Sequence, residues 1–252
     1  MNKLVIMLVT LPILCSCSGS NSPSPNSITD QNGDQNQQVE LNAGTAVSLA
    51  GDFCASRTHL DIVAKSILSV YAVKGNQALG FSCGGDIVLS EDGANFSIDV
   101  IDYCDASSGQ ELLLNGNING TVESGGNFTS NLNTLTVVGT DVDLAISGKT
   151  WDGRDDDMFL NLQVADQLRK TQLILEDVSI KKGLLDFGYI TFAEIGKYEF
   201  NFIEHFNSEL TKGQLFFYGN GGEIVIISAD NGDITVVHKA SKTDVGELIT
   251  TS

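Results

Sequence analysis

Two short motifs in this chain match the sequences of known chemical sites. Residues 80–84 (GFSCG) fit the pattern that places a nucleophilic serine, here Ser82, at a sharp turn between a strand and a helix. Residues 86–90 alternate as a strand does, so the required helix is not expected. Residues 147–150 (SGKT) match the end of a phosphate-binding loop, but Asp143 stands where that loop needs glycine. We interpret the second motif as a turn and predict that the protein is not an enzyme.

The most acidic stretch, residues 151–157 (WDGRDDD), also holds the only tryptophan. Asp152, Asp155 and Asp157 are weak candidates for a calcium site, because Ca²⁺ takes oxygen ligands. The closing glutamate of a calcium loop is missing from this spacing. We therefore favour an acidic hairpin that protects a sheet edge, and we predict no metal and no other cofactor.

Aromatic residues recur at alternate positions near residue 200. Tyr198, Phe200 and Phe202 would share one face of a strand. We expect them to belong to the core, and the wall of a ligand cavity is the alternative. The three histidines lie far apart in the sequence, and nothing marks a nucleophile beside any of them.

Two kinds of periodicity divide the chain near residue 77. Between residues 41 and 76 apolar residues recur at helical spacing, which predicts one long helix or a broken pair. From residue 77 to 252 about a dozen alternating segments follow, separated by turns rich in Gly, Asn and Asp. One of these, residues 230–233 (DNGD), is interpreted as a hairpin turn. The chain has 26 Gly and only 3 Pro, which suits turns that rely on glycine.

The short links between these segments predict antiparallel neighbours in a long meander. A sheet of about a dozen strands does not stay flat and open. We predict a mostly β fold, in which a curled sheet or incomplete barrel packs with one N-terminal helix in or across its mouth. A two-layer β-sandwich is the alternative.

The N-terminus has the form of an export signal. Lys3 precedes an apolar run, residues 4–14, that is too short for a permanent bilayer span. The run ends in Leu14-Cys15-Ser16-Cys17, which resembles the lipobox of bacterial lipoproteins. An ordinary signal peptide that leaves a free thiol at Cys17 is the alternative.

The lipobox resemblance implies a location. Residues 1–16 would be the signal peptide, and Cys17 would carry the lipid that anchors the protein to a membrane. Ser18 stands where an aspartate commonly marks inner-membrane retention, so we expect the outer membrane, on its periplasmic or surface side. Residues 17–40 are nearly all small or polar and are expected to be a disordered tether, which leaves residues 41–76 for the helix and 77–252 for the β domain.

Three cysteines follow the tether. Cys83 and Cys104 would close a loop of about twenty residues, which stabilises by roughly 3 kcal/mol. Cys54 lies on the apolar helical stripe, where a buried and inert thiol is common. A bridge from Cys54 to either of the others is the alternative.

A second resemblance covers about half of the β region. Cys83-Gly84-Gly85, the strand 96–104 that ends in Asp-Tyr-Cys, and residues 114–121 resemble a loose group of uncharacterised, β-rich bacterial lipoproteins. That resemblance implies the Cys83–Cys104 disulfide. It implies no activity, because the group shares none.

Charge limits the partners of the chain. The net charge of −18 and a pI near 4.2 exclude long-range attraction to nucleic acid. We expect the membrane, reached through the anchor on Cys17, and a protein, a glycan or a hydrophobic ligand.

Three functions follow, in order of preference. The first is a non-catalytic interaction or scaffolding lipoprotein of the cell envelope. The second is a carrier of a hydrophobic ligand or lipid in a curved-sheet cavity. The third is a hydrolase that uses Ser82 or a pair of carboxylates.

Overall fold

The computed structural model describes most of the chain after the tether. Its described residues are 40–75, 82–106, 110–124, 126–152, 158–181, 184–193, 195–207, 210–241 and 246–251. The predicted signal peptide, Cys17 and nearly all of the tether lie outside these ranges. The described residues form two compact units, a larger one within Ser56–Asn201 and a smaller one within Met1–Ala55 and Phe202–Ser252.

The N-terminal helix is a single element. Helix α1 spans Ala43–Tyr71 and continues into the 3₁₀ helix η1, Ala72–Gly75, so the long helix is confirmed and the broken pair is not formed. The Oδ1 atom of Asn42 accepts hydrogen bonds from the backbone N–H groups of Gly44 and Thr45, at 2.9 and 3.0 Å. The backbone N–H of Asn42 donates to Oγ1 of Thr45 at 2.8 Å. These reciprocal bonds fix the start of the helix.

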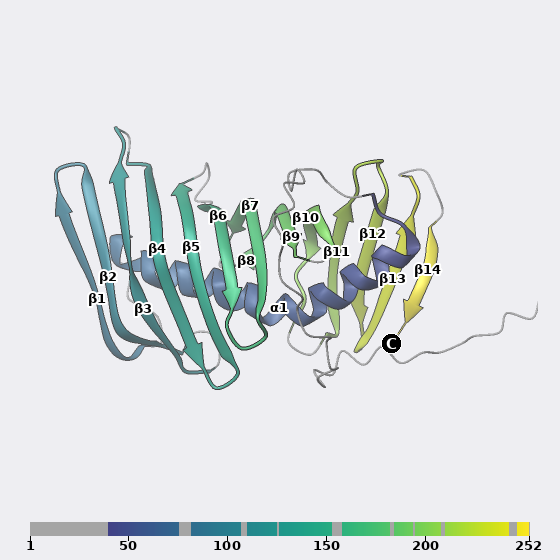
Figure 1. Cartoon of the computed structure of the whole chain (residues 1–252), viewed down its shortest axis with the longest axis horizontal. Helices are drawn as coiled ribbons and strands as arrows, with labels where there is room; N and C mark the ends of the chain where they lie inside the picture. The colour runs from purple at the N-terminus through teal and green to yellow at the C-terminus, as the bar shows by residue number, and fades with distance from the viewer. Residues whose placement is uncertain are drawn as a thin grey trace, which may run out of the picture. The chain divides into compact units, whose positions relative to one another are not determined.

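The strands form an open antiparallel meander (Figure 1). Except for β8, which pairs with β7, they follow one another in chain order, with β1 at one end and β14 at the other. A single sheet therefore forms, and neither a closed barrel nor the alternative two-layer sandwich is built by the described residues. The strands are β1 (Ser82–Asp92), β2 (Asn95–Asp105), β3 (Leu112–Val122), β4 (Phe128–Gly139), β5 (Val142–Asp152), β6 (Met158–Asp166), β7 (Thr171–Lys181), β8 (Leu184–Leu185), β9 (Phe187–Phe192), β10 (Gly196–Glu204), β11 (Lys212–Tyr218), β12 (Ile224–Asp230), β13 (Asp233–Lys239) and β14 (Glu247–Thr251).

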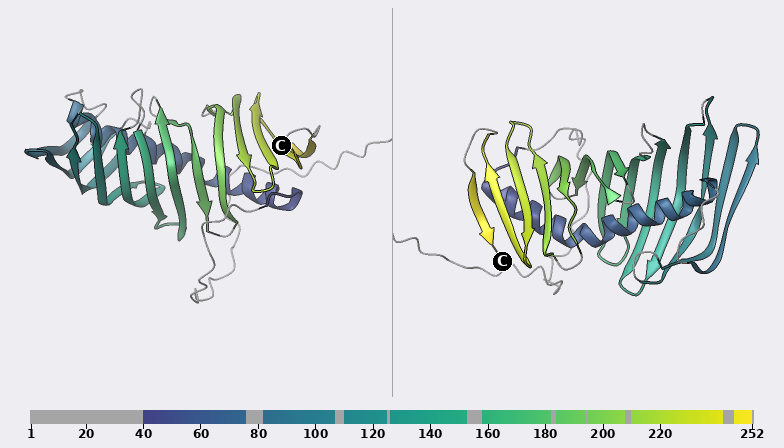
Figure 2. Two further views of the ribbon diagram at one scale, coloured as in Figure 1. Left: turned by 90° about the horizontal axis from the view of Figure 1, so that it is seen from above. Right: turned by 180° about the vertical axis from the view of Figure 1, so that it is seen from behind.

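In the larger unit the sheet has one face against the helix. Residues 56–71 of α1 lie along this inner face, in front of the strands when the sheet is seen from behind (Figure 2, right). The ring of Tyr71 stacks on Phe128 of β4, with centroids 5.2 Å apart. Alternate strand residues and one stripe of the helix are fully buried, as Leu114 and Val63 illustrate. The helix thus lies along a sheet face, whereas the sequence predicted it in or across a barrel mouth.

The smaller unit has its own core. The ring centroid of Phe53 in α1 is 5.7 Å from that of Phe206 and 5.9 Å from that of Phe217 in β11. His238 of β13 hydrogen-bonds through Nε2 to the backbone carbonyl of Leu41, at 3.2 Å. These aromatic rings pack with buried aliphatic residues such as Leu49 and Val225.

Bulges bend the strands of the larger unit. Asp102 in β2 has φ 46°, and its backbone N–H donates to Oδ1 of Asn115 on β3 at 2.8 Å. Gly85 on β1 approaches the Asp102 backbone so closely that a Cβ would collide with it. The arrangement recurs in β7, where Asp177 has φ 50° and donates to Oδ1 of Asn161 at 2.5 Å. Bulges of this kind increase local twist and curl the sheet.

The turn predictions had two outcomes. Asn231 and Gly232 both have positive φ, 52° and 94°, between β12 and β13, which confirms the tight hairpin expected from Asp230-Asn231-Gly232-Asp233. The interpretation of residues 147–150 as a turn is wrong. These residues lie inside β5 and pair with both β4 and β6.

Within the described residues, no helix combines the length and apolar character needed to cross a bilayer.

Candidate functional site

The outer face of the larger unit, opposite residues 56–71 of α1, carries a row of polar side chains. Strand pairing places these residues side by side from β1 to β6. All are exposed except Ser97, which is half-buried. Side chains at directly paired positions are close enough to bind one ligand together. We call this set the polar row: Ser90, Ser97, Asn119, Asn131, Lys149 and Asn161.

An open hollow of about 490 Å³ lies at the β1 end of the polar row. The hydroxyl and amide side chains of Ser90, Ser97, Asn119 and Asn131 line it, together with Thr121. Ser90, Ser97 and Gly120 among the lining residues have small side chains or none. The lining offers both hydrogen-bond donors and acceptors without a buried charge.

A row of aromatic side chains adjoins the polar row on the same face. The rings of Trp151 on β5 and Phe159 on β6 are 5.8 Å apart between centroids, with their planes at 12°. Phe187 of β9 meets Phe159 edge-on at 6.1 Å and is 42% exposed. Trp151 and Phe159 are half-buried. We call Trp151, Phe159 and Phe187 the aromatic row.

The hollow and the aromatic row form one continuous surface. Thr129 pairs with Trp151 on one side and with Thr121, which lines the hollow, on the other. The hydroxyl oxygens of Thr121 and Thr129 are 3.3 Å apart. A ligand that extends across β3, β4 and β5 would therefore contact both polar and aromatic groups.

A network of amides orients the side chains beside the hollow. Asn119 donates through Nδ2 to Oδ1 of Asn117 at 2.6 Å, and Asn133 donates to the same atom at 3.0 Å. Asn117 in turn donates to Oδ1 of Asp99 at 2.5 Å. Fixed amides lose little freedom when they bind a ligand, which favours affinity.

On the inner face, by contrast, one buried hydroxyl cluster joins the helix to the sheet. The phenol oxygen of Tyr71 is 2.5 Å from Oγ of Ser130 and 2.7 Å from Oγ1 of Thr150. Ser130 and Thr150 are themselves 2.7 Å apart. Burial disfavours the phenolate and raises the pKa of Tyr71 to about 12. The phenol stays protonated at neutral pH and holds the helix end on β4 and β5.

A second inner-face cluster contains a histidine–carboxylate pair. Nδ1 of His59 lies 3.2 Å from Oδ2 of Asp166, and Nη1 of Arg169 lies 2.7 Å from Nε2 of His59. Burial, followed by the charge of Arg169, lowers the pKa of His59, while Asp166 opposes the shift. Neutral His59 therefore donates from Nδ1 to Asp166 and accepts from Arg169. A general base needs a nitrogen aimed at its substrate, and here both ring nitrogens are occupied.

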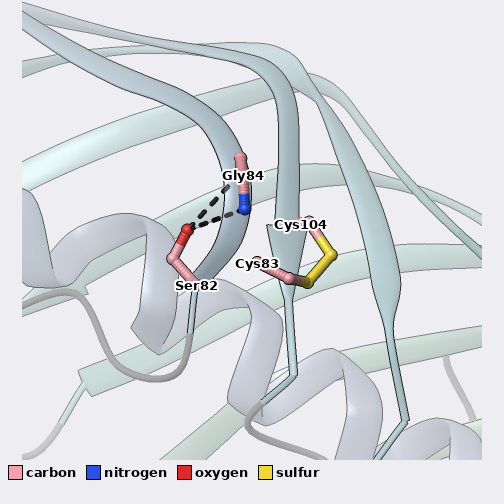
Figure 3. Close-up of a disulfide and its surroundings, with 4 residues drawn as sticks. All are labelled: Ser82, Cys83, Gly84 and Cys104. Atoms are coloured by element: carbon pink, nitrogen blue, oxygen red, sulfur yellow. Dashed lines mark hydrogen bonds between the residues drawn. A yellow bond between two sulfur atoms is a disulfide. The ribbon is translucent and has the colours of Figure 1, made fainter.

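The disulfide between Cys83 and Cys104 joins β1 to β2 (Figure 3). The two Cα atoms are 5.0 Å apart, and this pairing confirms the sequence prediction. Cys54 remains a thiol, so its alternative bridges are wrong, and it is half-buried where a buried residue was predicted.

Ser82 lies at the start of β1, beside this disulfide. Its Oγ accepts a hydrogen bond from the backbone N–H of Gly84 at 3.3 Å (Figure 3). Strand residues, and no helix, follow it. The strand-to-helix turn of a catalytic serine is therefore not formed at Ser82.

The structure tests one of the two clusters of candidate metal ligands. Glu111 lies near the sulfurs of Cys83 and Cys104, but these atoms form the disulfide and are not thiolate ligands. Asp152 accepts a hydrogen bond at Oδ2 from the backbone N–H of Phe128, at 3.2 Å. Asp155 and Asp157 lie outside the described residues, so the calcium hypothesis stays a prediction.

The aromatic residues proposed as a cavity wall are placed in the cores. Tyr198 and Phe200 are buried in the larger unit, and Tyr198 donates its hydroxyl to the carbonyl of Ile195 at 2.6 Å. Phe202 is half-buried in the smaller unit, with its ring centroid 6.0 Å from that of Phe53. None of the three lines the hollow on the outer face.

Sequence reasoning missed the outer face. Asn119, Asn131 and Phe159 occupy alternate positions in predicted strands, whereas Trp151 was predicted in an acidic hairpin and lies in β5. The neighbours of all four across the sheet depend on strand register. Comparison with known proteins adds nothing to this geometry, since no family model, no curated protein and no solved structure matches the chain. The function must therefore be argued from the chain's own residues.

Proposed function

We propose that the chain is a lipid-anchored protein of the bacterial cell envelope, and that its β region binds another envelope component without catalysing a reaction. The lipobox at residues 14–17 supports the anchor, with the outer membrane as its location. The polar tether that follows supports a folded part that stands away from the bilayer.

The continuous outer face of the larger unit is the observation that carries the binding role. Exposed amides, a hollow of about 490 Å³ and partly exposed aromatic rings lie together on it. Clefts with a few convergent polar groups and aromatic walls are typical of binding sites. The titratable groups of the inner face, by contrast, are held in structural contacts.

The two alternatives lack a supporting observation of this kind. Ser82 has the geometry of a strand residue, which does not favour a hydrolase. The hollow is open to solvent and most of the residues that line it have polar side chains, whereas a lipid carrier needs an enclosed apolar cavity.

Intact-mass measurement of protein purified from its own host tests the anchor. We expect loss of residues 1–16 and the added mass of acyl chains on the new N-terminus. A Cys17→Ser variant should lose the acyl mass and appear in the soluble fraction. An unmodified N-terminus on the native protein would contradict the proposal.

Co-sedimentation with envelope fragments of the host tests the binding role. The acylated protein in detergent micelles should be retained, and the double variant Trp151→Ala/Phe159→Ala should be released. Phe216→Ala is the matched control, because Phe216 is a half-buried aromatic residue on β11 of the smaller unit. Equal retention of the double variant and the native protein would contradict this use of the outer face.

A further inference from the structure

We propose that the outer face of the larger unit binds an uncharged glycan chain. Trp151, Phe159 and Phe187 would contact sugar rings, and the polar row with its hollow would bind sugar hydroxyl groups. This inference rests on the proposed function, because it names the ligand class of the same surface.

The aromatic row matches the apolar face of a sugar. A pyranose ring presents a patch of C–H groups, and the negative face of an aromatic ring attracts such weakly positive hydrogens. The three rings succeed one another across β5, β6 and β9 at centroid separations of 5.8 and 6.1 Å. A row of this kind suits a chain of linked sugars better than a single small molecule.

The polar row matches the hydroxyl edge of a sugar. Each hydroxyl group both donates and accepts, so it needs partners that do the same. Amides such as Asn119 and Asn131 and hydroxyls such as Ser90 and Thr121 have this property. The hollow of about 490 Å³ falls within the size range of small-molecule sites, roughly 300–1,000 Å³.

Charge selects an uncharged glycan over an anionic one. Glu91 and Asp92 border the hollow, and Lys149 is the only cation of the polar row. The whole chain carries a net charge of −18. Phosphate- or sulfate-rich polymers would be repelled by this field.

The mixture of side chains also favours a glycan over a protein partner. The centre of a protein–protein interface is usually apolar and well packed. Here amide and hydroxyl groups border the aromatic row, and the aliphatic side chains exposed on the same face, such as Leu113 and Val138, lie at the other ends of β3 and β4. Such a surface satisfies a ligand that presents hydroxyl groups along its whole length.

Tryptophan fluorescence tests this inference at the site itself, because Trp151 is the only tryptophan in the chain. The acylated protein in detergent micelles is titrated with β-linked hexasaccharides of glucose, xylose and N-acetylglucosamine, and with maltohexaose. We expect a saturable change in emission with at least one of them, and calorimetry should give the same dissociation constant. No saturable change and no heat with any of the four would overturn the proposal.

Variants then locate the binding. Phe159→Ala and Asn131→Ala should each weaken binding by about tenfold, the loss expected for one stacking contact or one well-placed polar contact. Phe216→Ala in the smaller unit and Gln163→Ala, an exposed polar residue elsewhere on β6, are the matched controls and should bind normally. A control that weakens binding as much as Phe159→Ala would overturn the assigned surface.

The outcomes separate this inference from the proposed function. If envelope fragments retain the acylated protein through Trp151 and Phe159 while no saccharide binds, the glycan assignment is wrong and the binding role stands. If the native N-terminus carries no lipid, the proposed envelope anchor is wrong whatever the saccharides do.

Discussion

The two faces of the larger unit use polar residues in opposite ways. On the inner face, the hydroxyl group of Tyr71 is bonded to Ser130 and Thr150, and both ring nitrogens of His59 have partners. On the outer face, Asn119 and Asn131 are exposed and border a hollow. The same strands build both faces, because successive side chains point to opposite sides.

This difference between the two faces indicates which of them carries the function. A buried polar group must be satisfied within the protein, so the inner clusters are part of the fold. Exposed side chains contribute little to stability and remain available to a ligand. Neighbouring residues of one strand point to opposite faces, so substitution of the inward residue should lower stability and substitution of the outward residue should weaken binding.

The largest expected effect comes from the apolar part of the inner face. Leu114→Ala should lower the free energy of unfolding by about 3 kcal/mol, because it removes a fully buried side chain from β3. Its neighbour Leu113 is 42% exposed on the other face, and Leu113→Ala should cost less than about 1 kcal/mol. Urea unfolding of both variants measures the difference, and equal losses would break the assignment of faces.

Loss of the disulfide should have the next largest effect. The double variant Cys83→Ser/Cys104→Ser should lose about 3 kcal/mol or somewhat less, because an open loop of 21 residues gains entropy when unfolded. Cys54→Ser is the control and should unfold nearly as the native protein does. Unchanged stability of the double variant under oxidising conditions would show that the bridge is not formed in solution.

The buried hydroxyl cluster should contribute less to the free energy of unfolding than the disulfide does. Tyr71→Phe should lower stability by about 1–2 kcal/mol, since it deletes the oxygen that bonds to both Ser130 and Thr150. The exposed hydroxyl pair of Thr121 and Thr129 provides the control, and Thr121→Val should change stability by less than about 0.5 kcal/mol. A larger loss from the exposed position than from Tyr71 would contradict the comparison.

The smallest expected effect is a pH dependence from His59. Its pKa is lowered on folding from the ordinary value of 6.5, so the unfolded chain takes up the proton more readily. The contribution of neutral His59 to the free energy of unfolding is therefore fully present above pH 6.5 and is lost as the pH falls below 6.5. Chemical unfolding between about pH 7.5 and pH 5.5 should show a steeper loss in the native protein than in His59→Gln. Identical slopes would show that the histidine does not titrate in this way.

Much of the fold could be predicted from the sequence. The alternation of apolar and polar residues predicted the strands and their antiparallel order. Asn231-Gly232 predicted the hairpin between β12 and β13. The 147–150 motif was misread as a turn, because its glycine and polar residues look like turn chemistry when the pairing with β4 and β6 is unknown.

The candidate site could not be predicted, and the reason is register. Asn119, Asn131, Trp151 and Phe159 come from four strands, and only their pairing places them together. The short two-residue strand β8 and the C-terminal strand β14 were also missed. Within β7 the bulge at Asp177 shifts the register, and no pattern in the sequence marks that shift.

Two adjacent residues of β4 offer the most direct test of the central claim, that the inner face stabilises the fold while the outer face binds. Ser130 points inward to Tyr71, and Asn131 lines the outer hollow. Stability and retention on host envelope fragments are measured together for Ser130→Ala and Asn131→Ala. We expect Ser130→Ala to lose about 1 kcal/mol of stability and bind normally, and Asn131→Ala to keep its stability and lose binding. Lost binding in Ser130→Ala, together with normal binding in Asn131→Ala, would contradict the account.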